Sequence, residues 1–228
     1  MTMKVPILYE DNHLLFVEKP VNVPVQEDRS GDKDLLTFLK EDIKVRHQKP
    51  GNVYLGLVHR LDRPVGGVMV FAKTSKAASR LSDSIRRGAM EKHYLAVLRG
   101  QPPKPEDRLE DYLVKDRRNN EVSVTDPGRD KAQKAVLEYE TEGTAKDVSL
   151  VSIQLHTGRP HQIRVQFASR GCPLYGDQKY GSSVNKPGQQ IALWSQTLAV
   201  EHPTKKEEIK VHSNPPEEHP WNLWKGKA

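Results

Sequence analysis

Residues 67–100 read GVMVFAKTSKAASRLSDSIRRGAMEKHYLAVLRG. The first six of them, Gly67–Ala72, are apolar at every position, which predicts a short strand buried on both faces in the middle of a sheet. Residues 75–87 carry apolar side chains at helical spacing, and residues 94–98 again look like a buried strand. We therefore expect a strand, a helix and a second strand in this stretch.

The expected helix has clear signals at both ends. Thr74 or Ser75 serves as its N-cap, because either hydroxyl can accept a hydrogen bond from a backbone N–H of the first turn. Gly88 stops the helix, since glycine adopts the left-handed conformation of a helix end without strain. The side chains expected to face the core are Ala77, Ala78, Leu81 and Ile85.

Shorter signals extend this pattern along the chain. Strands are expected at residues 7–9, 14–17, 151–155, 191–200 and 207–211, and helices at residues 35–43, capped by Asp32 or Asp34, and 161–170, with His161 and Arg164 on one face. The polar stretch 101–134 is predicted to form hairpins and exposed loops. Strands outnumber helices and do not alternate regularly with them, which favours a mixed α+β fold.

The composition excludes several classes of protein. Of the 228 residues, 36% are hydrophobic and 29% are charged, a balance that excludes collagen, a disulfide scaffold and an integral membrane protein. The first residues do not resemble a signal peptide. The single Cys172 cannot form an internal disulfide, which agrees with a reducing compartment. We expect a cytoplasmic protein that does not bind a membrane.

Positive charge is concentrated in two blocks of the sequence. The net charge is only +6, yet residues 44–100 contain 12 Lys and Arg against 3 Asp and Glu, and residues 155–186 contain 5 against 1. Ordinary solvated surface is one interpretation. A face that binds nucleic-acid phosphate is the other, because a local positive field attracts the backbone whatever its sequence.

Three segments carry residues suited to chemistry. In GLVHRLDRP, residues 56–64, Asp62 lies between two arginines that favour its ionised form, so it can act as an anionic nucleophile. Tyr94 lies in an expected strand. LHTGRPHQIR, residues 155–164, gathers donors where a helix is expected to begin, an arrangement that favours phosphate. His156 and His161 have no third ligand at suitable spacing, so no metal site is predicted.

On these residues the sequence resembles the RluA-type pseudouridine synthases, which isomerise uridines in RNA. The family motifs occur in order as KPVNVPV at 19–25, HRLD at 59–62, KHYLAV at 92–97, and TGRPHQIR at 157–164 continuing to GDQKYG at 176–181. The resemblance extends from Ile7 to about Val211. Two motifs depart from it: Val65-Gly66-Gly67 replaces the usual Thr-Ser-Gly, and Asn22 replaces a glycine, although asparagine tolerates a positive φ.

The resemblance implies a fold, a reaction and a partner. It implies one catalytic domain over residues 1–228, with a core at about 7–211, a tail at 212–228 and no separate N-terminal RNA-binding domain. Its sheet is expected to be central, mixed and largely antiparallel, flanked by helices and loops. Because isomerisation gains and loses no atoms, no redox or metal cofactor is expected. The expected partner is structured RNA, either rRNA or tRNA, and the enzyme is expected to be a monomer.

The resemblance also assigns roles to particular residues. Asp62 is the catalytic carboxylate, Arg164 is the ion-pair partner that orients it, and Tyr94 stacks on the uracil and can relay the proton of carbon 5. Arg60 fills the space left by the flipped uridine, and Ile163 packs against the ring. Phosphates are expected on the basic block from residue 73 to 99, at Lys76, Arg80, Arg86 and Arg87.

Two other functions remain open at this point. A catalytically idle RNA-binding protein of the same fold would explain the basic blocks, but it gives Asp62 no purpose, since an acid is unfavourable among phosphate contacts. A phosphoesterase that uses His156 and His161 is the third interpretation. The carboxylate itself could attack the anomeric carbon, add to carbon 6 or assist formation of a glycal, and the sequence does not choose among these routes.

Overall fold

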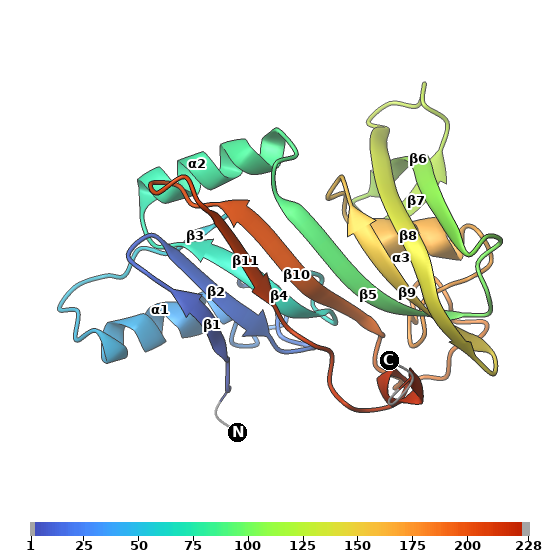
Figure 1. Cartoon of the computed structure of the whole chain (residues 1–228), viewed down its shortest axis with the longest axis horizontal. Helices are drawn as coiled ribbons and strands as arrows, with labels where there is room; N and C mark the ends of the chain where they lie inside the picture. Colours follow the sequence, from blue (N-terminus) through green and yellow to red (C-terminus); the bar gives the residue numbers. More distant parts are fainter. Residues whose placement is uncertain (1–2, 225–228) are drawn as a thin grey trace. The chain divides into compact units, whose positions relative to one another are not determined.

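A computed structural model describes residues 3–224 (Figure 1). These residues form two compact units. The first runs from the amino end to Glu91 and includes Ser195–Asn214, and the second comprises Lys92–Trp194 and the residues from Pro215 onward. Within each unit, antiparallel strands pair in a sheet, so the expected mixed α+β fold with a largely antiparallel sheet is confirmed. One catalytic domain over the whole chain stays a prediction.

The sheet of the first unit has the order β1-β2-β4-β10. Its strands are β1 (Ile7–Glu10), β2 (Leu14–Lys19), β4 (Gly66–Ala72) and β10 (Leu193–Glu201, in this unit from Ser195), while β3 (Gly56–Leu57) pairs with β4 and β11 (Glu208–His212) pairs with β10. β2 runs antiparallel to β4, with Leu14 opposite Ala72 and Lys19 opposite Gly67. This register places the end of β2 beside the start of β4.

Two capped helices belong to the first unit. Helix α1 spans Leu35–Arg46, and the Asp34 carboxylate accepts a hydrogen bond from the Thr37 N–H at 2.9 Å. Helix α2 spans Ser75–Arg86, and the Thr74 hydroxyl accepts one from the Ala77 N–H at 3.1 Å. The chain leaves α2 through Gly88, whose φ is +74°. Of the N-caps considered for each helix, Asp34 and Thr74 are therefore the ones used.

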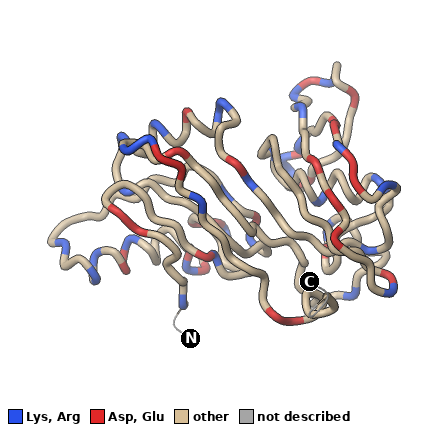
Figure 2. The backbone as a smooth tube through the Cα atoms, in the orientation of Figure 1, with Lys and Arg blue, Asp and Glu red and all other residues tan. Residues whose placement is uncertain are grey.

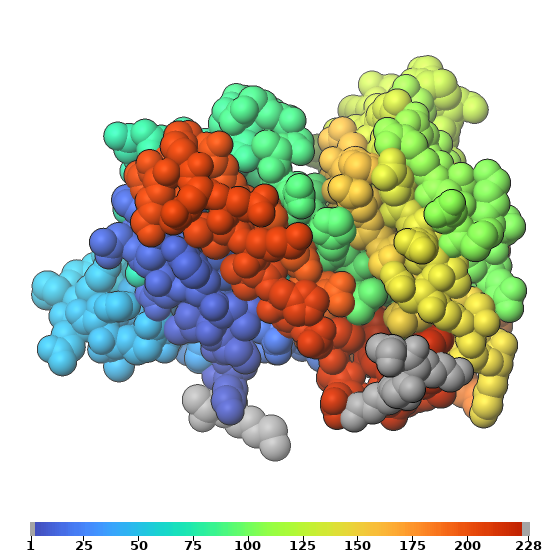
Figure 3. All heavy atoms as spheres, viewed as in Figure 1, coloured from blue at the N-terminus to red at the C-terminus, as the bar shows by residue number. Residues whose placement is uncertain are grey.

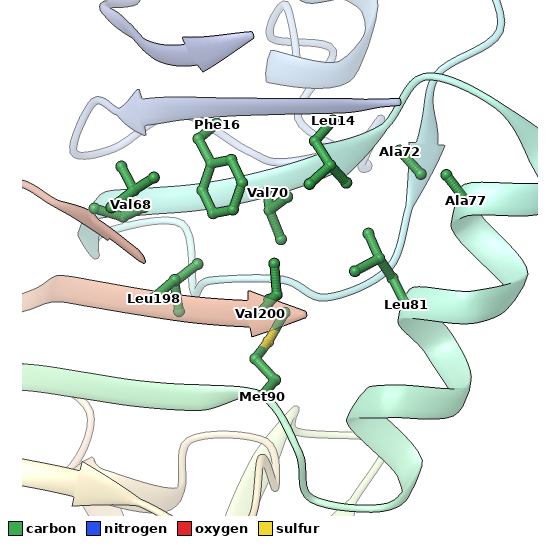
Figure 4. Packing of buried hydrophobic residues seen from close by; sticks show 11 residues of the cluster. Leu14, Phe16, Val68, Val70, Ala72, Ala77, Leu81, Met90, Leu198 and Val200 are labelled. Carbon is green, nitrogen blue, oxygen red and sulfur yellow. The ribbon is translucent and has the colours of Figure 1, made fainter. Parts of the chain in front are cut away.

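The core of the first unit lies between α2 and the sheet (Figure 4). Every residue of β4 is buried, as its apolar run predicts. Ala77 and Leu81 of α2 are buried in the same cluster as Phe16, Val70 and other sheet residues. Burying apolar area stabilises the folded chain by about 25 cal/mol per Å². This packing therefore holds the apolar face of α2 against the sheet and leaves the opposite face of the helix exposed.

The connection between β10 and β11 is held by a buried histidine. His202 has no exposed surface, and its Nε2 donates to the Asp11 carboxylate at 2.8 Å. Its Nδ1 accepts from the Lys205 N–H at 3.0 Å, so the proton belongs on Nε2. Arg80 of α2 donates to the Pro203 carbonyl. Figure 3 shows this hairpin, in orange and red, beside the blue amino-terminal strands.

The second unit contains a sheet of order β5-β9-β8-β6-β7 in which every neighbouring pair is antiparallel. Its elements are β5 (Glu91–Arg99, in this unit from Lys92), β6 (Glu106–Asp116), β7 (Glu121–Thr125), β8 (Gln133–Ala145), β9 (Val148–Leu155), helix α3 (Gln162–Ala168) and a 3₁₀ turn at Trp221–Trp224. Residues 101–134 do contain a hairpin, β6–β7, and exposed loops, as predicted.

Two local expectations need correction. The helix predicted at 161–170 is α3, Gln162–Ala168, because His161 has a φ of +52° and lies outside it as its N-cap. His161 and Arg164 therefore do not share a helix face. Strand β8 also extends through residues 135–145, for which the sequence predicts no strand. Within residues 3–224, no helix is long and apolar enough to cross a membrane.

Candidate active site

Asp62 lies in a tight turn of the first unit that leads into β4. The Val65 N–H donates to the Asp62 carbonyl at 3.0 Å, which closes the turn. The carbonyls of this turn are held from behind by Lys19, at the end of β2. Lys19 Nζ donates to the carbonyls of Arg63 at 2.9 Å, Val65 at 2.7 Å and Pro20 at 2.9 Å. A side chain from one strand thus fixes the backbone that carries the candidate carboxylate.

Lys19 is a fully buried cation, which is rare in proteins. Its three N–H groups match the three carbonyl acceptors, so burial leaves none of them unsatisfied. Burial lowers the pKa of Lys19 to about 7, with the attraction of Asp62 opposing this shift and the repulsion of Arg63 adding to it. Below about pH 7 the ammonium group therefore also contributes a positive charge behind Asp62.

The departures from the family motif have a structural explanation. Val65 is buried, and its carbonyl is the shortest of the three contacts to Lys19. Gly67 has a φ of +112°, and a Cβ atom there would lie 2.2 Å from the Ser195 carbonyl oxygen, so only glycine fits. Asn22 has a φ of +63°, which confirms that asparagine takes the positive φ of the usual glycine. Both residues therefore have a positive φ, which glycine and asparagine adopt more readily than other residues.

The two arginines that flank Asp62 in the sequence have different environments. Arg63 donates to the Ser30 hydroxyl at 2.9 Å and also pairs with Asp32, so it anchors the loop before α1. Arg60 is exposed and forms no hydrogen bond or ion pair within residues 3–224. Arg60 thus remains available for a partner outside the chain, whereas Arg63 stabilises the surroundings of the turn.

The other predicted catalytic residues lie in the second unit. Tyr94 is buried in β5 opposite Ile153 of β9. Ile163 and Arg164 are buried in α3. Arg60 and Asp62 thus belong to one unit and Tyr94, Ile163 and Arg164 to the other. The pairing of Arg164 with Asp62 and the stacking of Tyr94 on uracil stay predictions.

Arg164 is held by a carboxylate of its own unit. Its Nε donates to Asp177 Oδ2 at 2.8 Å and its Nη2 to Asp177 Oδ1 at 2.9 Å, a bidentate pair. Asp177 has no exposed side-chain surface; burial raises its pKa, but the hydrogen bonds and charge of Arg164 lower it on balance. The guanidinium also lies 5.1 Å from the centre of the Tyr180 ring. The guanidinium of Arg164 is therefore held by Asp177 along one edge and contacts the ring of Tyr180 on one face.

The predicted phosphate contacts share the exposed face of α2. Figure 2 marks basic and acidic positions along this helix. Arg86 and Arg87 both pair with Asp83, while their side chains stay 78% and 65% exposed. Lys76 and Arg80 are exposed residues of the same helix, and Arg80 contacts the Pro203 carbonyl. The structure thus places all four on one helix surface and adds one acid among them.

The two histidines considered for metal or phosphoester chemistry have separate partners. His156 Nε2 lies 3.3 Å from Glu138, and His161 Nδ1 lies 2.6 Å from the Tyr180 hydroxyl. Within the described part of the chain, no three His, Cys, Asp or Glu side chains are grouped so as to hold a metal ion. These contacts give each ring a structural role.

Sequence reasoning did not identify Lys19 and Asp177 as site residues, although both lie in the quoted motifs. Lys19 begins KPVNVPV, and Asp177 is the second residue of GDQKYG. A lysine immediately before proline at the end of an apolar strand is the sequence signal that could have indicated Lys19. Two of its three acceptors lie 44 and 46 residues further along the chain, so their identity required the fold.

Comparison with known proteins identifies relatives. The model of the family described as RNA pseudouridylate synthase matches residues 13–169. The uncharacterized RNA pseudouridine synthase YjbO of Bacillus subtilis is 34% identical, over 93% of this chain and 73% of its own length. Ribosomal large subunit pseudouridine synthase D of Xanthomonas campestris is 31% identical, over 93% of this chain and 66% of its own length. The structure of human RNA pseudouridylate synthase domain containing 4 has the same fold, with a TM-score of 0.78 at 24% identity over 92% of this chain and 88% of its own.

Proposed function

This chain belongs to the RNA pseudouridylate synthase family and is an isomerase, and on that premise we propose that Asp62 is its catalytic carboxylate. The observation that carries this proposal is the Lys19 anchor, because a buried side chain that binds the carbonyls of Arg63 and Val65 holds the Asp62 turn in one conformation. Preorganised groups avoid the cost of reorganisation during the reaction. A turn that served only to connect two strands would not need a buried cation behind it.

The reaction moves one base on one ribose. The bond between the anomeric carbon and nitrogen 1 breaks, the same uracil rejoins the sugar through carbon 5, and the hydrogen of carbon 5 leaves as a proton while nitrogen 1 gains one. No electrons are exchanged with another molecule. An ionised carboxylate can assist this by attack on the sugar, by addition to carbon 6 or by assisting glycal formation. Each route needs Asp62 charged and oriented.

Arg164 and Tyr94 complete the proposed machinery. With its Nε edge bound to Asp177, the guanidinium of Arg164 presents its other edge in a fixed direction. That edge suits a second carboxylate, and we assign Asp62 to it. Tyr94 is expected to stack on uracil and relay the proton of carbon 5, with Ile163 packing on the ring. Arg60, exposed beside Asp62 in the sequence, is expected to enter the stack that the uridine leaves.

The proposed substrate is a structured RNA, with ribosomal RNA as the first candidate. The relative from Xanthomonas campestris is named as a ribosomal large subunit enzyme, and it supports this choice over tRNA. Pseudouridines mapped in total RNA from cells with and without the gene identify the target. A position that loses its modification in the deletion strain and regains it with the wild-type gene, but not with Asp62→Asn, is the expected result.

The setting of the reaction is also part of the proposal. We expect a monomer that acts in the cytoplasm. The buried free thiol of Cys172 supports this compartment, because it requires no oxidising environment. Sedimentation of the purified chain at micromolar concentration tests the monomer. A stable dimer there contradicts it.

The decisive experiment measures tritium release from RNA labelled at carbon 5 of uridine. Asp62→Asn keeps the shape of the side chain but removes its charge, so release should be abolished while RNA binding stays close to wild type. Asp28→Asn, in an exposed acid of the same unit, serves as the matched control and should retain activity. Wild-type release by an Asn preparation free of deamidation removes Asp62 from the mechanism.

A further inference from the structure

In addition to the basic surface of α2, a cationic site lies in the second unit on β5, the strand that carries Tyr94. Lys92 is half-buried in β5, two residues before Tyr94. Alternate residues of a strand point to the same face and lie about 7 Å apart. Lys92 Nζ forms no hydrogen bond or ion pair with any residue of the described chain, 3–224. Lysines with a desolvated head group usually have an acidic partner, so this environment requires an explanation.

The charged group that acts on Lys92 is another cation, Arg159. Burial lowers the pKa of Lys92, and the repulsion of Arg159 lowers it further. Arg159 is itself fixed, because its Nε donates to the Lys134 carbonyl at 2.8 Å and its backbone N–H donates to Gln162 Oε1 at 3.0 Å. The rest of its guanidinium makes no contact of this kind within residues 3–224. The fold thus holds two like charges close together at an energetic cost.

The loop between them is built to leave room for a ligand. Gln162 is buried and accepts from both the Arg159 N–H and the Thr157 hydroxyl, which closes the loop. Apart from its neighbours in the chain, the only atom of residues 3–224 that a Cβ at Gly158 would meet within 4 Å is Lys92 Nζ, at 3.7 Å. A side chain at 158 would therefore project toward the ammonium group.

We propose that Lys92 and Arg159 form a phosphate subsite that binds the backbone of the substrate RNA on the Tyr94 side of β5. The inference rests on the proposed function, which makes RNA the ligand. One phosphodiester between the two cations removes their repulsion and satisfies their donors, and an arginine with a free edge suits phosphate geometry. None of the residues of this subsite belongs to α2, and both of its cations lie in the second unit.

Binding to a labelled 12-nucleotide oligouridylate tests the subsite without requiring catalysis. Each phosphate contact contributes about 0.7 to the slope of log affinity against log salt on single strands, which equals about fivefold in affinity for a tenfold change in salt. Lys92→Gln and Arg159→Gln should each reduce the slope by about that amount. Lys92→Arg should retain it. Lys186→Gln, which removes an exposed charge of the same unit, is the matched control and should leave the slope unchanged.

A second pair of variants leaves both cations in place. Gly158→Glu adds a carboxylate beside Lys92 that competes with phosphate, whereas Gly158→Gln adds a side chain of the same size without charge. The Glu variant should bind the probe at least fivefold more weakly than the Gln variant at 0.1 M salt. Because the two side chains have the same size, this difference in affinity reports the effect of the added charge and not an effect on steric fit or on folding.

The outcomes separate this subsite from the proposed function. Equal binding by Gly158→Glu and Gly158→Gln together with a wild-type slope for Lys92→Gln overturns the subsite, as does a wild-type chain that does not bind the probe. If these dependences hold and no tritium is released from any RNA, the subsite stands and the proposed function fails. If release occurs and the dependences are missing, the function stands and the phosphate is bound elsewhere.

Discussion

Lys19 Nζ lies 2.7 Å from the carbonyl oxygen of Val65, although the two residues are 46 positions apart in the chain. The contact joins the end of β2 to the turn that carries Asp62. It is one of three carbonyl contacts that use all the N–H groups of the ammonium ion. The order of the turn therefore depends on the protonation of Lys19, because a neutral amine has only two N–H groups to donate.

We predict opposite effects of pH on activity and on stability from Lys19. Its pKa is lowered from 10.5 to about 7 in the folded chain, so the unfolded chain binds this proton more tightly. The free energy of unfolding should therefore gain a contribution that rises with pH between about 7 and 10.5. Isomerisation should decline as pH rises through about 7, since the turn loses one hydrogen bond.

Lys19→Gln is the control for this prediction. Its amide has two N–H groups at every pH, so it resembles the neutral amine and should show neither dependence. The measurements are single-turnover rates and urea unfolding, both from pH 6 to 10. A Gln variant that keeps the wild-type decline in rate would assign that decline to another group.

Arg164→Lys should reduce activity far more than RNA affinity. A lysine keeps one positive charge but cannot bind Asp177 through two parallel hydrogen bonds and face a second carboxylate at the same time. Because Asp177 is completely buried, the Lys variant should also have a lower free energy of unfolding than the wild type, by about 2 kcal/mol or more. The rate at saturating RNA and the thermal midpoint measure both effects. A Lys variant with wild-type rate would mean that Arg164 does not orient Asp62.

The elements that the sequence predicted correctly have local causes. The apolar run of β4 and the cap at Thr74 are each visible within a dozen residues, and both occur as expected. β8 was missed beyond residue 134 because Ala135, Val136 and Leu137 are buried in succession, so the start of the strand does not show the alternation of buried and exposed residues. Its pairing with both β6 and β9 supplies the rest of the strand.

The residues of the candidate site also differ in whether their signals are local in the sequence. Asp62 could be proposed because its motif is contiguous in the sequence, and the positive φ of Asn22 agrees with the tolerance expected of its residue type. Lys19 binds carbonyls 44 and 46 residues away, so no short window of sequence contains both partners, and Asp177 lies 13 residues beyond Arg164, a spacing that by itself does not indicate a contact. The left-handed φ of His161 also separates it from the helix that the spacing predicted.

Gly67→Ala should prevent the first unit from folding. Its φ of +112° is unfavourable for alanine, and the new Cβ would lie 2.2 Å from the backbone oxygen of Ser195, which cannot move without breaking the sheet. We expect loss of soluble protein or a destabilisation of more than about 3 kcal/mol. Gly158→Ala is the matched control, because its Cβ would meet only Lys92 Nζ at 3.7 Å. Equal thermal midpoints for the two variants contradict this prediction.

The Asp11–His202 contact should set part of the acid stability. Burial raises the pKa of Asp11, but hydrogen bonds from the backbone of His13 and Leu14 and from His202 lower it to about 2 on balance. A lowered carboxylate pKa stabilises the fold above the ordinary value of 3.8, and this contribution is lost as pH falls toward 2. Asp11→Asn should therefore flatten the stability profile between about pH 4 and 2. If the free energy of unfolding, measured with urea, depends on pH as steeply in Asp11→Asn as in the wild type over that range, the assignment is wrong.

The α2 surface gives a prediction in which two substitutions act in opposite directions. Arg86 and Arg87 both pair with Asp83, so an RNA phosphate must compete with this carboxylate for them. Changing both arginines to alanine should reduce the salt slope of RNA binding by up to about 1 to 2 units if both contact phosphates.

Asp83→Asn, by contrast, releases both arginines and should raise affinity for RNA, with the largest gain at low salt, where the attraction is least screened. Catalytic rates at saturating RNA should change little in either variant, because α2 is expected to hold the backbone of the RNA and not the reacting uridine. Anisotropy titrations from 50 to about 300 mM salt make the comparison over the range where phosphate contacts dominate. If Asp83→Asn weakens binding, or if the double alanine variant keeps the wild-type slope, this face of α2 does not bind phosphate.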